Sequence, residues 1–473
     1  MTVSAVIILA AGKSKRMKTG KSKVLHPLLG RPMILYGVEL AQKLKPQKII
    51  VVVGKNSAEL REAVEVCRQE CLRHGLGHKV EFAVQREPRG TGDAARAALP
   101  RLKGMKGTAL IFYADTPLLQ ARTLKKVIRL CEQTRARLAL LTAIFPEPPA
   151  FGRIIRDGRC QVRGIIEDAD CTLKQKAVKE VNAGVYCADI EFLKSALLQI
   201  RNRNRQKEYY LTDLVKLSVD RGLPVVAATA QDFREALGVN SRSELAQAAS
   251  ILQEKINSAW MTNGVSLEDP CSIIIEPEVR IGRDTLIEAG ARLSGRTRVG
   301  KNCRVQAGAR IIDSTLADNV EVRQGSVIEE SRIGSGTSIG PMAHLRPGSK
   351  VGRNVRIGNF VELKKARVGD YTMAAHLTYL GDAIIGRRVN IGCGVISCNF
   401  DGVKKNTTII EDDAFIGSDS QLVAPVRVGK GAYIGSGSTI TEDVPPGYLA
   451  ISRGRQVTKP RPRLPGLKKG KKP

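Results

Sequence analysis

The most regular hydrophobic pattern lies in the C-terminal half of the chain, where an aliphatic residue recurs at every sixth position. Neither the 3.6-residue period of a helix nor the two-residue period of a strand produces this step. Three steps make a coil of eighteen residues, so the pattern predicts a triangular parallel β-helix with one aliphatic side chain pointing inward from each short strand. The three runs are Ile281, Ile287, Leu293, Val299, Val305 and Ile311; Ile333, Ile339, Leu345, Val351, Ile357 and Leu363; and Ile410, Ile416, Leu422, Val428, Ile434 and Ile440.

Glycine follows the inward aliphatic residue at many of these steps. We attribute it to the turn after each strand, which we expect to need a residue that tolerates unusual backbone dihedrals. These glycines are Gly282, Gly300, Gly334, Gly340, Gly352, Gly358, Gly417, Gly429 and Gly435.

The six-residue step is broken in two places. It shortens by one residue between Leu363 and Val368, and it lapses across the stretch CGVISCNFDGVKKNTT before Ile410. Insertions in a solenoid form loops on one face, which is often the functional face. Because the lapsed stretch contains polar and basic residues, we expect a functional role there. They are Asn399, Asp401, Lys404 and Lys405.

The N-terminal half alternates apolar, strand-like segments with segments of helical spacing. This order predicts an α/β domain with a mostly parallel sheet covered by helices. Ligands of such sheets bind beyond the carboxyl ends of the strands. The predicted strands are Ser4–Leu9, Ile49–Val53, Val80–Val84, Ala109–Tyr113, Leu138–Phe145 and Val225–Ala228, and the predicted helices are Met33–Leu44, Ala58–Glu70 and Thr91–Leu99.

A long amphipathic helix is predicted between the two halves, over Ser241–Trp260. Ser241 fits its N-cap and Glu244 the third helical position, which together form a capping box. The predicted organisation is therefore an α/β domain over 1–240, a linker helix over 241–262, a β-helix over 263–453 and a basic tail over 454–473.

Two features at predicted strand ends suggest phosphate chemistry. The first strand runs into the loop LAAGKSKRM, whose small residues can present backbone N–H groups to phosphate while Lys13 and Arg16 add positive charge. The loop is neither a P-loop nor a G-x-G-x-x-G motif. Asp115 follows the strand that ends at Tyr113, where a carboxylate could bind Mg²⁺ or could simply cap a helix.

Composition limits the class of protein. Lys and Arg number 76 and Asp and Glu 46, which gives a net charge of +30 and favours anionic partners. No apolar run reaches the ~18 residues of a membrane-spanning helix, and the N-terminus does not read as a signal peptide. The ten cysteines form no Cys-x-x-Cys motif and no zinc-type cluster with histidine, which is typical of reduced thiols in the cytoplasm.

The LAAG loop, the linker helix and the hexapeptide solenoid together resemble one family, the bifunctional N-acetylglucosamine-1-phosphate uridyltransferase / glucosamine-1-phosphate N-acetyltransferases of bacterial cell-wall precursor synthesis. The most specific stretch runs from Arg346 to Phe415 and includes HLTYLGD and NFDG. The resemblance implies a left-handed β-helix that acetylates glucosamine 1-phosphate with acetyl-CoA. It also implies an N-terminal domain that couples the product to UTP, and a cytoplasmic homotrimer with acetyltransfer sites between subunits.

For acetyltransfer, the resemblance makes His376 the base that takes a proton from the attacking amine. Imidazole titrates close to neutral pH, and the position of His376 beside the irregular coil favours this role over a structural one. The residues that match the family's sugar-phosphate and catalytic pocket are Arg346, Lys364, Tyr379, Asn390 and Lys405. Those that match its acetyl-CoA positions are Cys393, Asn399, Phe400, Ser418, Ser436 and Arg453.

For uridylyl transfer, the resemblance implies an in-line attack on the α-phosphorus of UTP. This reaction needs charge neutralisation more than acid–base chemistry, which Lys23, Arg16 and Mg²⁺ would supply. The resemblance assigns the metal to Asp115 and Asn240. The matching nucleotide-loop residues are Ala10, Gly12 and Lys23, the uracil-binding residues are Gln85, Gly90 and Thr91, and the sugar-binding residues are Gly152, Glu167 and Asn182. The chain departs from the family's pattern in this half at Ser14, Lys15, Ser22, Asp93 and Ala114.

Two other interpretations remain open from the sequence. One is a nucleotidyltransferase with a different base or sugar, whose solenoid only regulates or oligomerises, as in glucose-1-phosphate adenylyltransferases. The other is a non-catalytic scaffold in a nucleic-acid-bound assembly, similar to subunits of the eukaryotic translation initiation guanine-exchange factor. Aromatic residues make up only 4% of the chain and no RNA-recognition motif is present, so we expect no nucleic-acid partner beyond non-specific binding by the tail.

Overall fold

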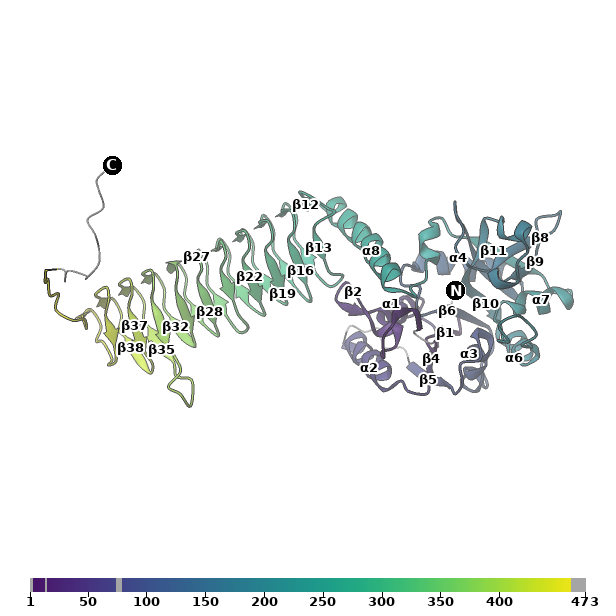
Figure 1. The fold of residues 1–473 in the computed structure, drawn as a ribbon, viewed down its shortest axis with the longest axis horizontal. Helices are drawn as coiled ribbons and strands as arrows, with labels where there is room; N and C mark the ends of the chain where they lie inside the picture. The colour runs from purple at the N-terminus through teal and green to yellow at the C-terminus, as the bar shows by residue number, and fades with distance from the viewer. Residues whose placement is uncertain (1–2, 13–14, 74–78, 461–473) are drawn as a thin grey trace, which may run out of the picture. The chain divides into compact units, whose positions relative to one another are not determined.

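The computed structural model describes residues 3–12, 15–73 and 79–460 (Figure 1). Lys13, Ser14 and tail residues 461–473 lie outside these ranges, as do the side chains of Lys15, Cys67 and Cys71. The chain divides into two compact units, Met1–Leu252 and Gln253–Pro473. None of the helices in the described ranges is long and apolar enough to cross a lipid bilayer.

The N-terminal unit is built on one nine-stranded sheet, whose main path has the order β11-β7-β10-β6-β1-β4-β5. The strand β1 lies at its centre and pairs in parallel with β4 and β6. The sheet strands on this path are β1 (Ala5–Leu9), β4 (Lys48–Gly54), β5 (Lys79–Gln85), β6 (Thr108–Tyr113), β7 (Leu138–Ile144), β10 (Glu180–Asp189) and β11 (Val225–Thr229).

Alternate residues of the buried strands face opposite sides of the sheet, and each side has its own hydrophobic core. In β1, Val6 and Ile8 belong to one core, together with residues of α1 and α4, whereas Ile7 and Leu9 belong to the other, with residues of α3, α6 and α7. The helices of this unit are α1 (Met33–Gln42), α2 (Ala58–Arg73), α3 (Thr91–Ala97), α4 (Ala121–Thr134), α5 (Leu173–Lys176), α6 (Ile190–Gln199) and α7 (Asp213–Asp220).

The structure confirms the six strands and three helices predicted in this half, with ends that differ by at most three residues. The prediction of a mostly parallel sheet is also confirmed. It missed β10, which pairs antiparallel with both β6 and β7, and the hairpin of β8 (Arg153–Arg156) and β9 (Val162–Ile166) beside it.

The predicted interdomain helix is α8 (Arg242–Thr262). Its capping box is present, because the Glu244 N–H donates to Ser241 Oγ at 3.2 Å and the Ser241 N–H donates to the Glu244 carboxylate at 2.9 Å. Ala248 and Ile251 pack in a core of the N-terminal unit. Ile256 and Trp260 pack against the solenoid core, so the division between the units falls inside α8.

The C-terminal unit is the predicted parallel β-helix, with three sheets of eleven, ten and nine short parallel strands. It runs from β12 (Ser266–Leu267) to β41 (Leu449–Ala450) (Figure 1). Strands of successive coils stack in register, as Ile281 on Val299. Every aliphatic residue of the three predicted runs is at most 8% exposed and belongs to a single core. The six-residue period therefore sets both the burial and the stacking of this unit.

We predicted that the glycines after these strands adopt unusual backbone dihedrals. This prediction is wrong for all of them but Gly340, whose φ is 97°. The others have no positive φ, and they are required because the next coil approaches closely. A Cβ on Gly334 would lie 2.5 Å from the backbone carbonyl of Gly352. The left-handed conformation instead falls two residues later, at Asn302 and Asn354 for example.

The lapse in the repeat is a projecting loop between β34 (Ile396–Cys398) and β35 (Thr408–Ile410). Phe400 and Lys405 form an antiparallel bridge across it. The Asp401 carboxylate accepts hydrogen bonds from the N–H groups of Val403 and Lys404 at 2.9 and 2.8 Å, and another from the Asn406 amide. These bonds lower the pKa of Asp401 to about 2. The loop is therefore a defined turn that carries Lys405.

Candidate functional site

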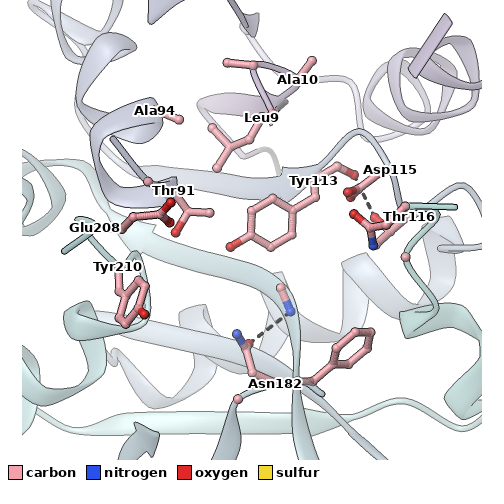
Figure 2. Close-up of a pocket in the computed structure, with 18 of the residues that line it drawn as sticks. Leu9, Ala10, Thr91, Ala94, Tyr113, Asp115, Thr116, Asn182, Glu208 and Tyr210 are labelled. Carbon is pink, nitrogen blue, oxygen red and sulfur yellow. Dashed lines mark hydrogen bonds between the residues drawn. The ribbon is translucent and has the colours of Figure 1, made fainter. Parts of the chain in front are cut away.

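A cavity of about 620 Å³ opens in the N-terminal unit beyond the carboxyl ends of β1, β5 and β6 (Figure 2). This is where a parallel α/β sheet is expected to bind its ligand. The cavity brings together all the residues predicted for nucleotide and sugar binding that the structure describes, from segments far apart in the chain. They are Ala10, Gly12, Arg16, Lys23, Gln85, Gly90, Thr91, Asp115, Gly152, Glu167, Asn182 and Asn240.

The predicted metal ligands lie together in this cavity. Lys23 pairs with the Asp115 carboxylate and donates a hydrogen bond to Asn240 Oδ1 at 2.7 Å. The two oxygens thus already surround one positive charge. A carboxylate and an amide oxygen suit Mg²⁺, which takes its remaining ligands from phosphate and water. No cluster of three or more His, Cys, Asp or Glu side chains suited to a metal occurs among the described residues.

The alternative role of Asp115 as a helix cap is excluded. The helix that follows, α4, begins at Ala121 with Gln120 as its N-cap. The backbone carbonyl of Asp115 accepts from the Val239 N–H at 2.8 Å, which brings the segment before α8 beside it. Glu244 of the capping box also accepts from the Asn240 N–H at 2.6 Å. The start of α8 therefore positions Asn240 next to Asp115.

The base-binding side of the cavity lies between the end of β5 and the start of α3. Gln85 is almost fully buried, and its amide donates to the Gly90 carbonyl at 3.1 Å and to the Asp93 carboxylate at 2.9 Å. Gly90 has a φ of 112°, and a Cβ there would lie 2.6 Å from the carbonyl oxygen of Tyr209. Only glycine allows this approach.

The sugar-binding side contains a half-buried carboxyl group. Glu167 lines the cavity with Gly152 and Asn182, and Thr212 donates to its Oε1 at 2.9 Å. Burial raises the pKa of Glu167, although the Thr212 bond opposes the shift. Asn182 Oδ1 accepts from the Gly184 N–H at 3.1 Å, which fixes its side chain. This side can therefore offer several fixed polar groups to sugar hydroxyls.

Several lining residues were not among the predicted site residues. Figure 2 shows the Tyr113 ring between Thr91 and Asp115, and burial raises the pKa of this phenol. Tyr113 ends β6 directly before Ala114 and Asp115, so its position at the end of a strand was the available signal. Glu208 and Tyr210 lie in a loop without a motif, and only the fold brings them to the cavity. Ala114 is buried without positive φ, so the fold accommodates this departure from the family's pattern.

In the solenoid, three of the predicted sugar-phosphate residues, Arg346, Lys364 and Lys405, form a cationic group beside one sheet. Arg346 follows β25 (His344–Leu345), and Lys364 ends β28 (Glu362–Lys364). Lys405 of the projecting loop lies close to Lys364 and lowers its pKa, and Arg346, which also pairs with Glu362 at 2.9 Å, adds to this effect. Three mutually repelling cations favour an anion such as a phosphate between them.

His376 lies on another sheet, at the end of β30 (Met373–His376). Its Nδ1 is 2.9 Å from Asn359 Oδ1, and the two residues are paired on adjacent strands. Because a side-chain carbonyl oxygen only accepts, Nδ1 donates in this contact, and in the neutral imidazole the lone pair is therefore on Nε2. Asn359 was not predicted, and within the described ranges no hydrogen bond joins His376 to the cationic group.

The predicted acetyl-CoA residues follow the last coils. Arg453 donates to the Ser436 carbonyl at 2.9 Å, and the Ser418 carbonyl accepts from the Gly437 N–H at 2.8 Å, so these residues lie on stacked turns. Cys393 and Phe400 are exposed. The remaining predicted residues are Tyr379 in β31 (Tyr379–Gly381), Asn390 in β33 (Asn390–Ile391) and Asn399, which donates to Asp382 at 2.5 Å.

Comparison with known proteins accounts for both units. Residues 6–249 match the MobA-like NTP transferase domain family, residues 274–368 the GMPPB C-terminal domain, and residues 407–442 six repeats of the bacterial transferase hexapeptide. The bifunctional protein GlmU of Trichlorobacter lovleyi is 44% identical over 97% of this chain and 98% of its own length. The chain belongs to the GlmU family. The GlmU proteins of Pelobacter propionicus and Shouchella clausii are 45% and 43% identical, each over 96% of this chain and 97% of their own length.

Membership of the GlmU family confirms the resemblance found in the sequence. It also confirms the prediction of a nucleotidyltransferase unit followed by a hexapeptide-repeat transferase unit. A solenoid that only regulates and a non-catalytic scaffold are both disfavoured, because the GlmU proteins match across both units.

Proposed function

We propose that this chain makes UDP-N-acetylglucosamine in two steps, one on each unit. The observation that carries the proposal is the nearly full-length match to bifunctional GlmU proteins, which spans the cavity of the first unit and the repeats of the second. Glucosamine 1-phosphate is first acetylated on the solenoid, and the product then reacts with UTP in the N-terminal unit.

In the first step, the glucosamine amine attacks the thioester carbonyl of acetyl-CoA. The C–N bond forms, His376 Nε2 takes a proton from the amine, and the C–S bond breaks to release the coenzyme A thiolate, to which the imidazolium returns the proton. Asn359 holds the required tautomer through Nδ1. Arg346, Lys364 and Lys405 bind the sugar phosphate, while Tyr379 and Asn390 complete the sugar pocket.

Acetyl-CoA lies along the last coils in this proposal, against Cys393, Asn399, Phe400, Ser418, Ser436 and Arg453. His376 and the cationic group lie on different sheets of the prism. We therefore propose a homotrimer whose acetyltransfer sites are completed by residues of an adjacent subunit.

In the second step, a phosphate oxygen of N-acetylglucosamine 1-phosphate attacks the α-phosphorus of UTP. The new P–O bond forms as the bond to the β-phosphate breaks, and pyrophosphate leaves. Lys23 and Arg16 offset the negative charge of the phosphates. Asp115 and Asn240 would hold Mg²⁺, which neutralises phosphate charge when bound. Gln85, Gly90 and Thr91 bind uracil, while Gly152, Glu167 and Asn182 bind the sugar. Both steps use cytoplasmic metabolites, so we place the enzyme there.

Two assays on the purified protein test this function. Release of free thiol from acetyl-CoA should require glucosamine 1-phosphate, and release of pyrophosphate from UTP should require N-acetylglucosamine 1-phosphate and Mg²⁺. A protein that releases pyrophosphate but no thiol would be a nucleotidyltransferase with a structural solenoid. A protein with neither activity would contradict the whole proposal.

A further inference from the structure

The amide of Gln85 is held in one orientation by its neighbours. Both groups it contacts, the Gly90 carbonyl and the Asp93 carboxylate, can only accept hydrogen bonds. The end of the Gln85 side chain that faces them must therefore be the NH₂ group, and the carbonyl oxygen Oε1 is turned to the other side.

The side to which Oε1 turns is the cavity. Gln85 is only 6% exposed and lines the cavity, and no residue in the described ranges donates a hydrogen bond to Oε1. A ligand in the base-binding side of the cavity thus meets a fixed acceptor. A fixed acceptor favours a ring that presents an N–H group and disfavours one that presents a lone pair.

We propose that Asp93 is a specificity-determining positioning residue, which fixes the Gln85 amide so that the enzyme accepts uracil and rejects cytosine. The proposal places Oε1 opposite N3 of the base: there uracil presents N–H, a donor, and cytosine a lone pair, an acceptor, while the 4-amino donor of cytosine lies one ring position away. The inference rests on the uridylyl transfer proposed above. Asp93 need not touch the nucleotide, since it acts through the orientation of Gln85.

Asp93 also has a possible structural role that must be separated from this one. It is the third residue of α3, in the first turn, where a carboxylate stabilises a helix through its dipole. Loss of that stabilisation would lower stability or affect all nucleotides alike. It would not change the preference between two pyrimidine nucleotides, so the ratio of their kcat/KM values separates the two roles.

The decisive variant is Asp93→Asn, which keeps the shape of the side chain. Its amide can either accept from the Gln85 NH₂ group or donate to a reversed Gln85 carbonyl, so the orientation is no longer fixed from this side. We expect the kcat/KM ratio of UTP to CTP, measured by Mg²⁺-dependent pyrophosphate release, to fall about tenfold, as befits one charge-assisted hydrogen bond. Asp93→Ser, which removes the carboxylate and keeps a small polar group, should lower the ratio in the same direction.

Glu87→Gln is the matched control. Glu87 lies two residues beyond Gln85, is exposed, and pairs with Arg89 and not with Gln85. The Glu87→Gln substitution removes the same charge as Asp93→Asn near the same cavity, and the UTP to CTP ratio of kcat/KM should stay unchanged. In a Gln85→Ala background, Asp93→Asn should have no further effect on the ratio, because the group that it positions is gone.

An unchanged UTP to CTP ratio in folded, active Asp93→Asn protein would overturn the inference, as would an equal fall in the Gln85→Ala background. If the unmodified enzyme released no pyrophosphate from either nucleotide, the uridylyl transfer itself would be refuted and the inference with it. If the unmodified enzyme is active and the Asp93→Asn variant keeps the same UTP to CTP ratio, the inference about Asp93 is refuted while the uridylyl transfer stands. Melting temperatures of the variants verify that each is folded.

Discussion

The two units of the chain assemble their functional residues in opposite ways. In the N-terminal unit, the cavity residues come from segments as far apart as Ala10 and Asn240, and the sheet brings them together. In the solenoid, Asn359 and His376 are seventeen positions apart and meet because adjacent coils stack in register. One site depends on long-range topology and the other on a local period.

Because of this contrast, we expect mutations in the two units to have different consequences. A side chain in the cavity can be removed without affecting the solenoid, which has its own core. Within the solenoid, by contrast, each coil is the surface on which the next one packs. We therefore expect chemical changes to remain within one unit, and backbone changes in the solenoid to act through stability.

The largest expected effect is that of His376→Ala, which removes the proposed base. Acetyltransfer should fall by about 10³, within the range that general base catalysis contributes, while uridylyl transfer stays unchanged. His344→Ala is the matched control, because His344 is another solenoid histidine whose ring nitrogen contacts a polar side chain, that of Glu329 at 3.2 Å. Thiol release measures the first activity and pyrophosphate release the second. Loss of both activities in a folded variant would contradict separate sites.

Asp115→Ala should have the reverse effect. It removes one of the two oxygens proposed to hold Mg²⁺, and we expect uridylyl transfer to fall by about 10² with acetyltransfer intact. The dependence of the rate on Mg²⁺ concentration should shift to higher concentrations at the same time. If pyrophosphate release and its Mg²⁺ dependence were both unchanged, Asp115 would have no part in metal binding.

A substitution of one methyl group should test coil stacking. Gly334→Ala places a Cβ 2.5 Å from rigid backbone of the next coil, and we expect it to lower the free energy of unfolding by about 1–3 kcal/mol. Ala317→Gly is the control, because Ala317 occupies the same position one coil earlier. It should cost no more than about 1 kcal/mol. Chemical denaturation of both variants measures the difference, and equal stabilities would show that the coils adjust freely.

The smallest effect concerns the loop that carries Lys405. In the folded loop the pKa of Asp401 is about 2, below the ~3.9 of an unfolded aspartate. A depressed carboxyl pKa stabilises the loop above about pH 4, and this contribution is lost as the pH falls towards 2. An NMR titration of the Asp401 carboxyl should give the low pKa directly. Asp401→Asn should remove the pH-dependent change of the neighbouring amide signals, and an ordinary pKa near 4 would contradict the turn.

How much the sequence could predict follows from the same contrast. The solenoid was predicted down to its inward residues, because a six-residue period decides burial locally. The antiparallel strand β10 was missed, since its place between β6 and β7 is set by the sheet and not by its own pattern. The glycines were identified, but their cause was not, because contact between coils is invisible in a single repeat.

The candidate sites show the same limit. The resemblance named the cavity residues, and the fold brought them together. It did not name Asn359 or Tyr210, and it noted Asp93 only as a departure from the family's pattern. The roles of Asn359 and Asp93 depend on the side chains beside them. Asn359 became evident only through its bond to His376, and Asp93 only through the buried amide of Gln85.

The two ends of the solenoid are protected unequally. Ile256 and Trp260 of α8 cover the first coils, whereas Tyr448 and Leu449 of the last coil are each more than 60% exposed. Backbone amides should therefore exchange with deuterium fastest at the C-terminal coil and progressively more slowly towards α8, because a stack of coils opens from its more exposed end. Ser436 and Arg453, which we propose to contact coenzyme A, lie at that end, so added coenzyme should slow exchange there first.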